Sequence, residues 1–281
     1  MRFAYAGIDF MAEALEGFLA AGWEPVKLFT RPCDGVLDHN ERVIARARSL
    51  RIPIQMSRLR PEDLATLSDC CLVVAGYPWR IEGWRGAIPY ALNFHPSPLP
   101  EGRGPYPLYR ALLEGRRDWG VSAHVIEPEF DTGAVIAQER FPLGEAETHE
   151  TLLMRCQMAT GRLARRIAGD FAALWAGAEP QGRGSYWPRA TDAQRTLDWT
   201  SSVDEILGRV RAFGAIETLA RVGPGVVHVA EAQGWREPHG HAPGTVVHTY
   251  RRLLVVAARD GYVVLTRWSP ISREAAREIG R

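Results

Sequence analysis

The chain has 281 residues, of which 46% are hydrophobic, 24% charged and 9% aromatic. This composition is typical of a folded globular protein and excludes a disordered, fibrous or coiled-coil chain. No apolar run approaches the ~18 residues of a membrane-spanning helix, and the start lacks the basic region and apolar block of a signal peptide. We therefore expect a cytoplasmic protein. Its net charge of +1 provides no strong overall field for binding a nucleic acid.

Lysine and cysteine usage excludes several kinds of site. The single lysine, Lys27, lies in the apolar run 26–29, so a phosphate-binding loop ending in Gly-Lys-Ser/Thr is absent. A strand residue whose ammonium reaches solvent explains Lys27 better than a Schiff base does. No Cys-x-x-Cys pair occurs, so we expect free thiols in a reducing compartment, with neither a zinc site nor disulfides. The cysteines are Cys33, Cys70, Cys71 and Cys156.

The first ~95 residues alternate apolar strands with helical stretches. We expect strands at 3–6, 26–30, 52–55, 71–75 and 90–94. Helices are expected at 11–21, closed by Gly22, and at 39–50. Because strands that alternate with helices are joined by right-handed crossovers, they form a mainly parallel sheet with both faces buried. The sequence therefore predicts an α/β domain.

The next part of the chain continues this pattern as far as a Gly- and Pro-rich segment. A helix is expected at 105–113, and strands at 119–126 and 135–141. Thr148 is a candidate cap for one long helix that reaches about Trp175, because apolar residues recur every three or four positions. The segment 177–189 breaks the pattern. We place the domain boundary there, between a first domain of residues 1–181 and a second of residues 182–281.

The second domain is expected to be a small, barrel-like antiparallel β structure. Ser202 is a candidate cap for a helix at 203–213. Short β-branched runs separated by turn residues then follow, as in small antiparallel barrels. They lie at 216–222, 225–231, 244–249, 253–258 and 261–267.

Polar residues with catalytic chemistry follow the last strand of the parallel sheet. Asn93 and His95 share one face of that strand because side chains alternate. They lie at its carboxyl end, where ligands bind in open α/β sheets. The Pro-Ser-Pro-Leu-Pro run that follows excludes a helix. Asp131, in a loop between two expected strands, is an acidic group that could orient the imidazole. Taken alone, Asn93 and His95 are equally well interpreted as a turn cap and a half-buried histidine.

The segments NFHPSPLPEGRGPYP (93–107) and GVSAHVIEPEFDTGAVI (120–136) resemble the signature of the 10-formyltetrahydrofolate-dependent formyltransferases. That family includes methionyl-tRNA, glycinamide ribonucleotide, sugar-amine and hydroxyornithine formyltransferases. Its pattern is Asn-x-His-x-Ser-Leu-Leu-Pro followed by Asp-Thr-Gly, and both halves are present. Pro98 stands where the family usually has leucine, and it stiffens the loop. The resemblance is clear over residues 1–175 and weaker after 190.

The resemblance implies a Rossmann-like catalytic domain, a smaller barrel-like β domain, and transfer of the formyl group of 10-formyltetrahydrofolate to an amine. Asn93 and His95 would donate hydrogen bonds to the oxyanion that forms on the formyl oxygen. Asp131 would orient His95 and raise its pKa, and Asp131 or a relayed water would accept the amine proton. No metal is expected.

The resemblance also implies a folate slot between two loops. Its residues in the loop before the Asn93 strand are Tyr77, Pro78, Trp79, Arg80 and Ile81, and those in the loop before Asp131 include Glu127 and Phe130. A core or lid role for Trp79 is an equal alternative.

Two other motifs, a histidine cluster and a Gly-rich segment, are given structural interpretations. His239-Gly240-His241, with His228 and His248, is expected in a solvated hairpin and not in a metal site. Residues 182–185 are expected to form a linker.

The nature of the acceptor is inferred from the length and the charge of two parts of the chain. Methionyl-tRNA enzymes of the family typically carry a longer, Gly- and Lys-rich insertion after the second strand. Here the matching segment 31–50 is short, lacks lysine, and contains Asp34, Asp38 and Glu41. From residue 182 onward there are 14 Arg against 10 Asp plus Glu, a thin surplus for binding RNA phosphates. We therefore expect a small amine, of the hydroxyornithine or nucleotide-linked amino-sugar type, and keep methionyl-tRNA as the alternative.

Two other classes are weaker alternatives. In a formyltetrahydrofolate hydrolase, water replaces the amine, but those enzymes carry an N-terminal regulatory domain. This chain begins at the first sheet strand, which argues against that class. A non-catalytic folate-binding module is disfavoured because Asn93, His95 and Asp131 are all present.

Overall fold

The computed structural model describes residues 1–33, 35 and 38–271, without the side chains of 215–217. These residues form two compact units. The first contains Met1–Pro107, Arg117–Leu143 and Leu153–Trp187. The second contains Leu108–Arg116, Gly144–Leu152 and the described residues from Pro188 onward. Two short segments, 108–116 and 144–152, thus belong to the second unit, although the segments on either side of each belong largely to the first unit. The division at 181/182 stays a prediction about independently folding domains.

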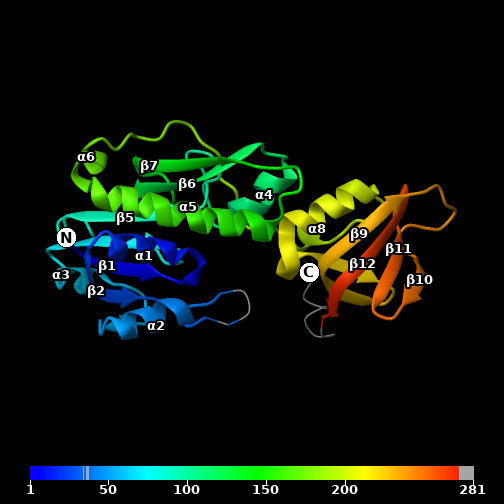
Figure 1. The fold of residues 1–281 in the computed structure, drawn as a ribbon, viewed down its shortest axis with the longest axis horizontal. Coiled ribbons are helices and arrows are strands. Elements are labelled where there is room, and N and C mark those ends of the chain that lie inside the picture. The colour runs from blue at the N-terminus through cyan, green and yellow to red at the C-terminus, as the bar shows by residue number, and fades with distance from the viewer. Residues whose placement is uncertain (34, 36–37, 272–281) are drawn as a thin grey trace. The chain divides into compact units, whose positions relative to one another are not determined.

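The first unit is built on a seven-stranded sheet with the order β3-β2-β1-β4-β5-β6-β7 (Figure 1). Its strands are β1 Arg2–Gly7, β2 Glu24–Phe29, β3 Ile54–Gln55, β4 Cys70–Ala75, β5 Tyr90–His95, β6 Asp118–Val125 and β7 Val135–Pro142. The first five strands in this order pair in parallel, whereas β6 and β7 join antiparallel. The predicted mainly parallel, Rossmann-like sheet is confirmed, with β5 near its centre.

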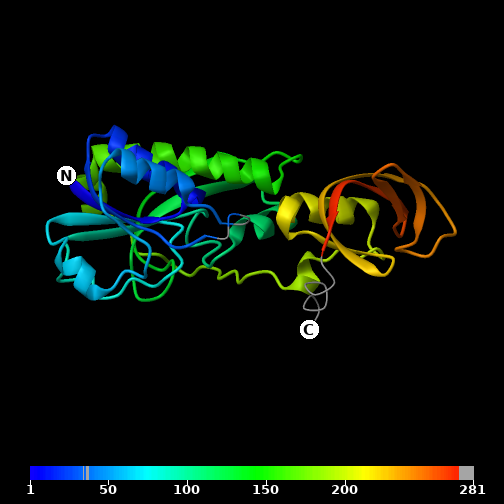
Figure 2. The same cartoon turned by 90° about the horizontal axis from the view of Figure 1, so that it is seen from below.

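Helices cover both faces of this sheet. On one face α1 (Glu13–Ala20) packs against α5 (His149–Gly169), so closely that a Cβ added at Gly17 would lie 2.5 Å from the Cβ of Ala164. The other face carries α3 (Pro61–Ala65), whose Leu64 is buried in a cluster with Leu72 of β4. Figure 2 shows α5 and α3 on opposite sides of the sheet. Both faces of the sheet are therefore covered, and Asn93 and His95 lie near the end of β5.

The prediction of one long helix reaching Trp175 is wrong. Helix α5 ends at Gly169, and a separate α6 (Phe171–Ala176) follows Asp170, whose φ of −129° and ψ of 38° are not helical. The break turns Phe171 and Trp175 toward Tyr90, with ring centroids 4.9 and 5.0 Å away. Aromatic packing against the sheet thus stabilises the change of direction.

Several further helices are short. They are the 3-10 helix Asp9–Met11, α2 Glu41–Ser49, α4 Pro107–Leu113 and α7 Asp192–Arg195. The sequence pattern missed α3 and α7, because elements of five and four residues are too short for periodicity to be read.

The second unit contains α8 (Val203–Glu217) and a five-stranded antiparallel sheet with the order β10-β11-β12-β9-β8. Its strands are β8 Leu219–Val222, β9 Gly225–Arg236, β10 Val246–Tyr250, β11 Leu253–Ala257 and β12 Gly261–Pro270. Ser202 caps α8 as predicted, because its Oγ accepts a hydrogen bond from the Glu205 N–H at 3.3 Å. The predicted small antiparallel β domain is confirmed.

The single lysine and the four cysteines of the chain all lie in the first unit. The Lys27 ammonium lies 3.7 Å from Asp63 Oδ1 and 4.6 Å from the Phe29 ring centroid, so this half-buried lysine is paired with a carboxylate. Cys70, Cys71 and Cys156 are buried and Cys33 is partly exposed, and none of the four forms a disulfide. Among the described helices, none combines the length and the apolar character needed to cross a membrane.

Candidate active site

Strand β5 presents Asn93 and His95 on one face, as the alternation of side chains predicts. Its neighbour β6 pairs with it antiparallel, so that Asn93 lies opposite His124 and His95 lies opposite Ser122. His95 is only 6% exposed. Both residues lie at the carboxyl end of a central strand, which is the position where open α/β sheets bind ligands.

His95 is held between two hydrogen-bond acceptors. Its Nε2 lies 2.9 Å from the carbonyl oxygen of Gly102, and its Nδ1 lies 3.5 Å from Asp131 Oδ1. A neutral imidazole has one N–H and can donate to only one of them. Burial lowers the pKa of His95 below its ordinary 6.5, against the opposing effects of Asp131 and Gly102. Asp131 raises the pKa of His95, as the sequence predicts, but burial has the larger and opposite effect, so the net shift is downward.

Asp131 is 8% exposed and has a positive φ of 60°. Its Oδ2 accepts a hydrogen bond from the Gly104 N–H at 2.9 Å. Burial by itself would favour the neutral acid, but His95, His124 and the Gly104 N–H outweigh it and hold the pKa of Asp131 well below its ordinary value. The carboxylate thus stays ionised next to a histidine that burial keeps neutral near pH 7.

His124 is a site residue that the sequence reasoning missed. Its Nδ1 lies 2.8 Å from the Val125 carbonyl oxygen, and its Nε2 lies 3.1 Å from Asn93 Nδ2 and 3.6 Å from Asp131 Oδ1. In the neutral ring Nδ1 donates to the carbonyl, so Nε2 accepts from the Asn93 amide. The sequence signal was a histidine in an apolar strand, seven positions before Asp131.

The loop after His95 is fixed by a hydrogen-bond network with β6 and β7. Ser122 Oγ donates to the Ser97 carbonyl at 2.6 Å and accepts from the Leu99 N–H at 2.9 Å. Gln138 of β7 donates to the same Ser122 Oγ at 2.9 Å, and also to the Leu99 carbonyl. Strands β6 and β7 therefore hold the backbone of the loop that follows His95. The same loop carries Gly102, which contacts His95, and Gly104, which contacts Asp131.

The two loops expected to form the folate slot lie side by side. The Arg80 guanidinium lies 5.1 Å from the ring centroid of Phe130, which is 46% exposed. Ile81 and Tyr77 belong to one buried cluster with Ile126, and Trp79 is partly buried against it. The Glu127 carboxylate forms an ion pair with Arg85 at 2.6 Å. Pro78 is exposed. The structure thus brings together the residues of both loops, although their contact with folate stays a prediction.

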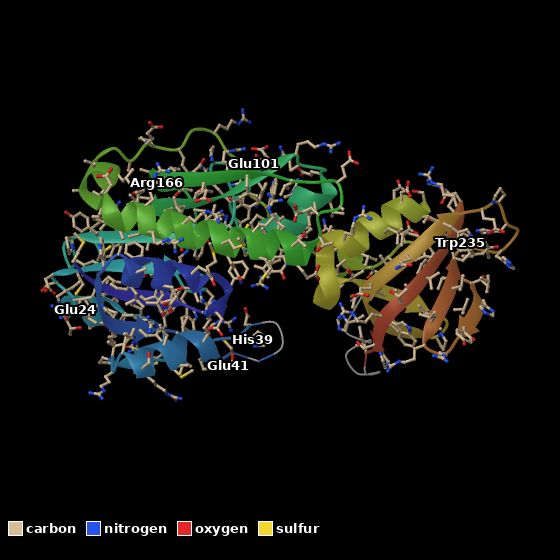
Figure 3. The ribbon with its side chains drawn as sticks, in the orientation of Figure 1. Glu24, His39, Glu41, Glu101, Arg166 and Trp235 are labelled. Carbon is tan, nitrogen blue, oxygen red and sulfur yellow. The ribbon has the colours of Figure 1, made fainter. Side chains whose placement is uncertain are left out.

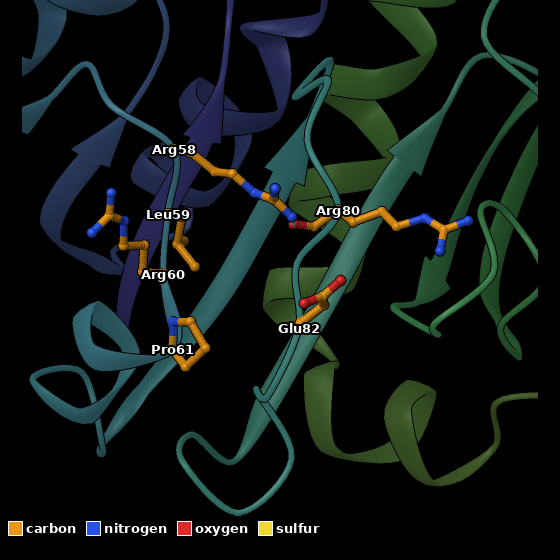
Figure 4. Close-up of a pocket in the computed structure, with 6 residues that line it drawn as sticks. All are labelled: Arg58, Leu59, Arg60, Pro61, Arg80 and Glu82. Atoms are coloured by element: carbon orange, nitrogen blue, oxygen red, sulfur yellow. Dashed lines mark hydrogen bonds between the residues drawn. The ribbon is translucent and has the colours of Figure 1, made fainter.

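A pocket of about 310 Å³ lies next to the loop that carries Arg80 (Figure 4). It is lined by Arg58, Leu59, Arg60, Pro61, Arg80 and Glu82. Arg58 donates to the Arg80 carbonyl at 3.4 Å. The lining residues carry more positive than negative charge, which favours an anionic ligand. Figure 4 shows the Arg60 and Arg80 guanidinium groups pointing to opposite sides, with the Arg58 guanidinium at the Arg80 backbone.

The structure gives no support to a metal-binding histidine cluster. Among the described residues, no three His, Cys, Asp or Glu side chains are arranged to hold a metal ion. His239 Nε2 lies 2.9 Å from the Ala258 carbonyl and 3.0 Å from the Gly261 carbonyl, and its ring lies 4.6 Å from that of Tyr262. These contacts give His239 a structural role in the hairpin.

Comparison with known proteins defines the class. Residues 81–166 match the formyl transferase model, and residues 189–277 match the model of the formyl transferase C-terminal domain. Methionyl-tRNA formyltransferase from Thiobacillus denitrificans is 31% identical, over 94% of this chain and 90% of its own. The enzyme of the same name from Gluconobacter oxydans is 30% identical, over 95% of this chain and 91% of its own.

Solved structures show the same fold at lower identity. The N-formyltransferase from Helicobacter canadensis, in complex with folinic acid and dTDP-3-aminofucose, has a TM-score of 0.67 at 16% identity, covering 95% of this chain and 99% of its own. HypX from Aquifex aeolicus, in complex with tetrahydrofolic acid, has a TM-score of 0.68 at 19% identity. The match covers all of this chain but only 47% of HypX.

The chain belongs to the formyl transferase family. Its membership confirms the predicted activity, that of a 10-formyltetrahydrofolate-dependent N-formyltransferase. The relatives and the structural neighbours differ in the acceptor that their names give.

Proposed function

We propose that Asn93, His95 and Asp131 catalyse transfer of the formyl group to an amine. The observation that carries the proposal is that Asp131 Oδ1 lies 3.5 Å from His95 Nδ1 and 3.6 Å from His124 Nε2, which in turn contacts the Asn93 amide at the end of β5. One N–H of the Asn93 amide is engaged by His124 Nε2 at 3.1 Å. The second N–H of that amide can donate to the formyl oxygen as it becomes an oxyanion, the kind of donor worth about 10²–10³ in rate.

The directions in which the pKa values of His95 and Asp131 are shifted suggest a role for each in the proton transfer. The amine nitrogen attacks the formyl carbon, forming one C–N bond, and the bond between that carbon and N10 of the folate then breaks. The amine loses a proton and N10 gains one. His95, which burial keeps neutral, can take up and return this proton, directly or through a water. Asp131, whose pKa is held low, is a poor base and orients His95.

Alanine substitutions test this assignment. Asn93→Ala, His95→Ala and Asp131→Ala should each lower kcat by at least ~10²-fold, with folate binding measured by calorimetry largely kept. The assay uses 10-formyltetrahydrofolate with a panel of amines. Near-normal turnover of His95→Ala would overturn the proposed roles.

The folate is proposed to bind between the loops that carry Arg80 and Phe130. The carboxylates of its glutamate tail are proposed to bind in the pocket lined by Arg58, Arg60 and Arg80. Arg58→Ala and Arg80→Ala should then weaken binding of a glutamate-bearing 5-deazafolate at least about tenfold, since charged hydrogen bonds contribute ~1.5–3 kcal/mol. Binding of the same ring system without glutamate should change little. Arg48→Ala, an exposed substitution on α2, is the control. Equal losses for both ligands would contradict the tail assignment.

For the acceptor we propose a small soluble amine. Residues 34, 36 and 37 of the segment 31–50, Asp34 among them, lie outside the described residues. Of the arginines in this segment, Arg31 pairs with Asp38, Arg42 with Glu13, and Arg46 with Glu16. At the start of α2, His39 Nδ1 lies 3.6 Å from a Glu41 carboxylate oxygen (Figure 3). These pairs leave few cations in the segment for RNA phosphates.

In the second unit, too, arginines are paired with carboxylates. Several of its arginines form ion pairs with its own carboxylates, namely Arg195 with Asp192, Arg236 with Asp204, Arg259 with Glu205, and Arg267 with Glu231. Internal pairing reduces the positive field that RNA binding requires. Methionyl-tRNA stays the second candidate, because it is named in the relatives that match both domains.

A further inference from the structure

Gln181 uses every hydrogen-bonding position of its side-chain amide. Its Oε1 accepts from Arg103 Nε at 3.0 Å and from Arg103 Nη2 at 2.8 Å. Its Nε2 donates to the carbonyl oxygens of Asp131 at 2.9 Å and Gly133 at 2.7 Å. A primary amide offers two donors and two acceptor lone pairs, so all four are satisfied. The side chain therefore joins two loops that are far apart in the sequence.

The first of these loops carries Asp131 in an unusual conformation. Its φ of 60° lies in the left-handed region, which is uncommon for residues other than glycine, although aspartate adopts it more readily than most. The two Nε2 bonds bracket Thr132 and fix the carbonyls on either side. The orientation of the Asp131 side chain toward His95 thus depends on a backbone that Gln181 holds.

The second loop touches both members of the buried pair through its backbone. The Gly102 carbonyl lies 2.9 Å from His95 Nε2, and the Gly104 N–H donates to Asp131 Oδ2 at 2.9 Å. Arg103, which lies between them, also exchanges backbone hydrogen bonds with Ser185 at 2.9 Å and Trp187 at 2.6 Å. The segment 181–187, predicted to be partly linker, therefore pairs along the turn 102–104.

We propose that Gln181 is a positioning residue that sets the geometry of the His95–Asp131 pair by tying the Asp131 loop to the Arg103 turn. The inference rests on the proposed function, because it requires that this pair acts in catalysis. Gln181 reaches the reacting groups only through the backbone of both loops. Its loss should lower turnover while folate binding is kept, since a displacement of about 1 Å at a catalytic group can cost ~10²-fold in rate.

Three variants separate the hydrogen bonds between Gln181 and the Asp131 loop from those between Gln181 and Arg103. Gln181→Glu keeps an acceptor for Arg103 but turns a carboxylate toward two carbonyl oxygens. Gln181→Met keeps the length and removes all four hydrogen bonds. Arg103→Lys keeps the charge and loses the two-bond contact with Oε1. Gln233→Glu and Gln233→Met, at an exposed position of β9, are matched controls.

We expect kcat to fall about 10- to 100-fold in both Gln181 variants and less in Arg103→Lys, with KM for 10-formyltetrahydrofolate within about twofold of wild type. The two Gln233 variants should be unchanged. NMR titration of the His95 ring without substrate supplies a second readout. Its midpoint should move in the Gln181 variants, because the distance to Asp131 sets how strongly the carboxylate favours the charged ring.

Wild-type kcat together with an unmoved His95 titration in Gln181→Glu would overturn the inference, as would a loss of kcat that only follows the folded fraction in thermal unfolding. If Gln181→Met does not fold, Gln181→Glu and Arg103→Lys still decide. His95→Ala separates the two proposals. An active His95→Ala enzyme contradicts the proposed function itself, whereas an inactive one beside wild-type-like Gln181 variants contradicts this inference alone.

Discussion

His95 and Asp131 form an ionisable pair whose members are both almost fully buried. A motif of asparagine, histidine and aspartate predicts that the carboxylate raises the pKa of the imidazole, because opposite charges stabilise each other. The sequence does not show how deeply the pair is buried, and burial is the larger effect on His95. His124 was missed for a related reason. Its role depends on its lying opposite Asn93 in the antiparallel register, which no local pattern reveals.

The lowered pKa of His95 predicts a pH dependence of stability. The unfolded chain binds a proton at His95 near pH 6.5, whereas the folded chain binds it only at lower pH. The free energy of unfolding should therefore fall as the pH drops below about 6.5, because the unfolded state binds more protons there. Urea unfolding of wild type and His95→Gln between about pH 7.5 and 5 checks this, with a shallower slope expected for the variant. Equal slopes would contradict it.

The elements of the first unit were predictable where a continuous apolar run or an apolar helix stripe marks them. Strands such as β1 and β4 are apolar runs buried on both faces, whereas the helices α1, α2 and α5 bury one stripe, and all of them occur close to where the sequence places them. The break at Asp170 was not predictable, because the apolar stripe of α5 continues into Phe171. The role of residues 181–187 was hidden for another reason. Their partners lie about 80 positions earlier in the chain, and composition indicated only a flexible linker.

The loop that holds Asp131 should be intolerant of a side chain at Gly133. A Cβ there would lie 1.8 Å from the Val125 carbonyl oxygen, so backbone must move. Gly133→Ala should lower the free energy of unfolding by about 1–3 kcal/mol, the usual cost of overpacking, and lower kcat as well. At Gly144, nothing lies within 4 Å of an added Cβ, so Gly144→Ala is the control. Denaturant unfolding that ranks the two variants equally would contradict the expected crowding.

For the molecule as a whole, family membership fixes the reaction but not the acceptor. The relatives that match both domains are named methionyl-tRNA formyltransferases, while a solved structure of the same fold holds a nucleotide-linked amino sugar. The two units carry many arginines in internal ion pairs. The acceptor must therefore be decided by a property that distinguishes a polyanion from a small amine.

Salt dependence provides that property. An enzyme that binds tRNA through about six or more phosphate contacts loses ~10³-fold or more in affinity between roughly 50 and 200 mM salt, because each contact releases counterions. We expect kcat/KM for the small-amine acceptor to change by less than about threefold over this range, since only short-range contacts inside the site are involved. The measurement uses one enzyme preparation with a panel of amino sugars and hydroxylated amino acids beside methionyl-tRNA. Efficient formylation of methionyl-tRNA with a steep salt response, while the small amines stay inert, would decide for the tRNA acceptor.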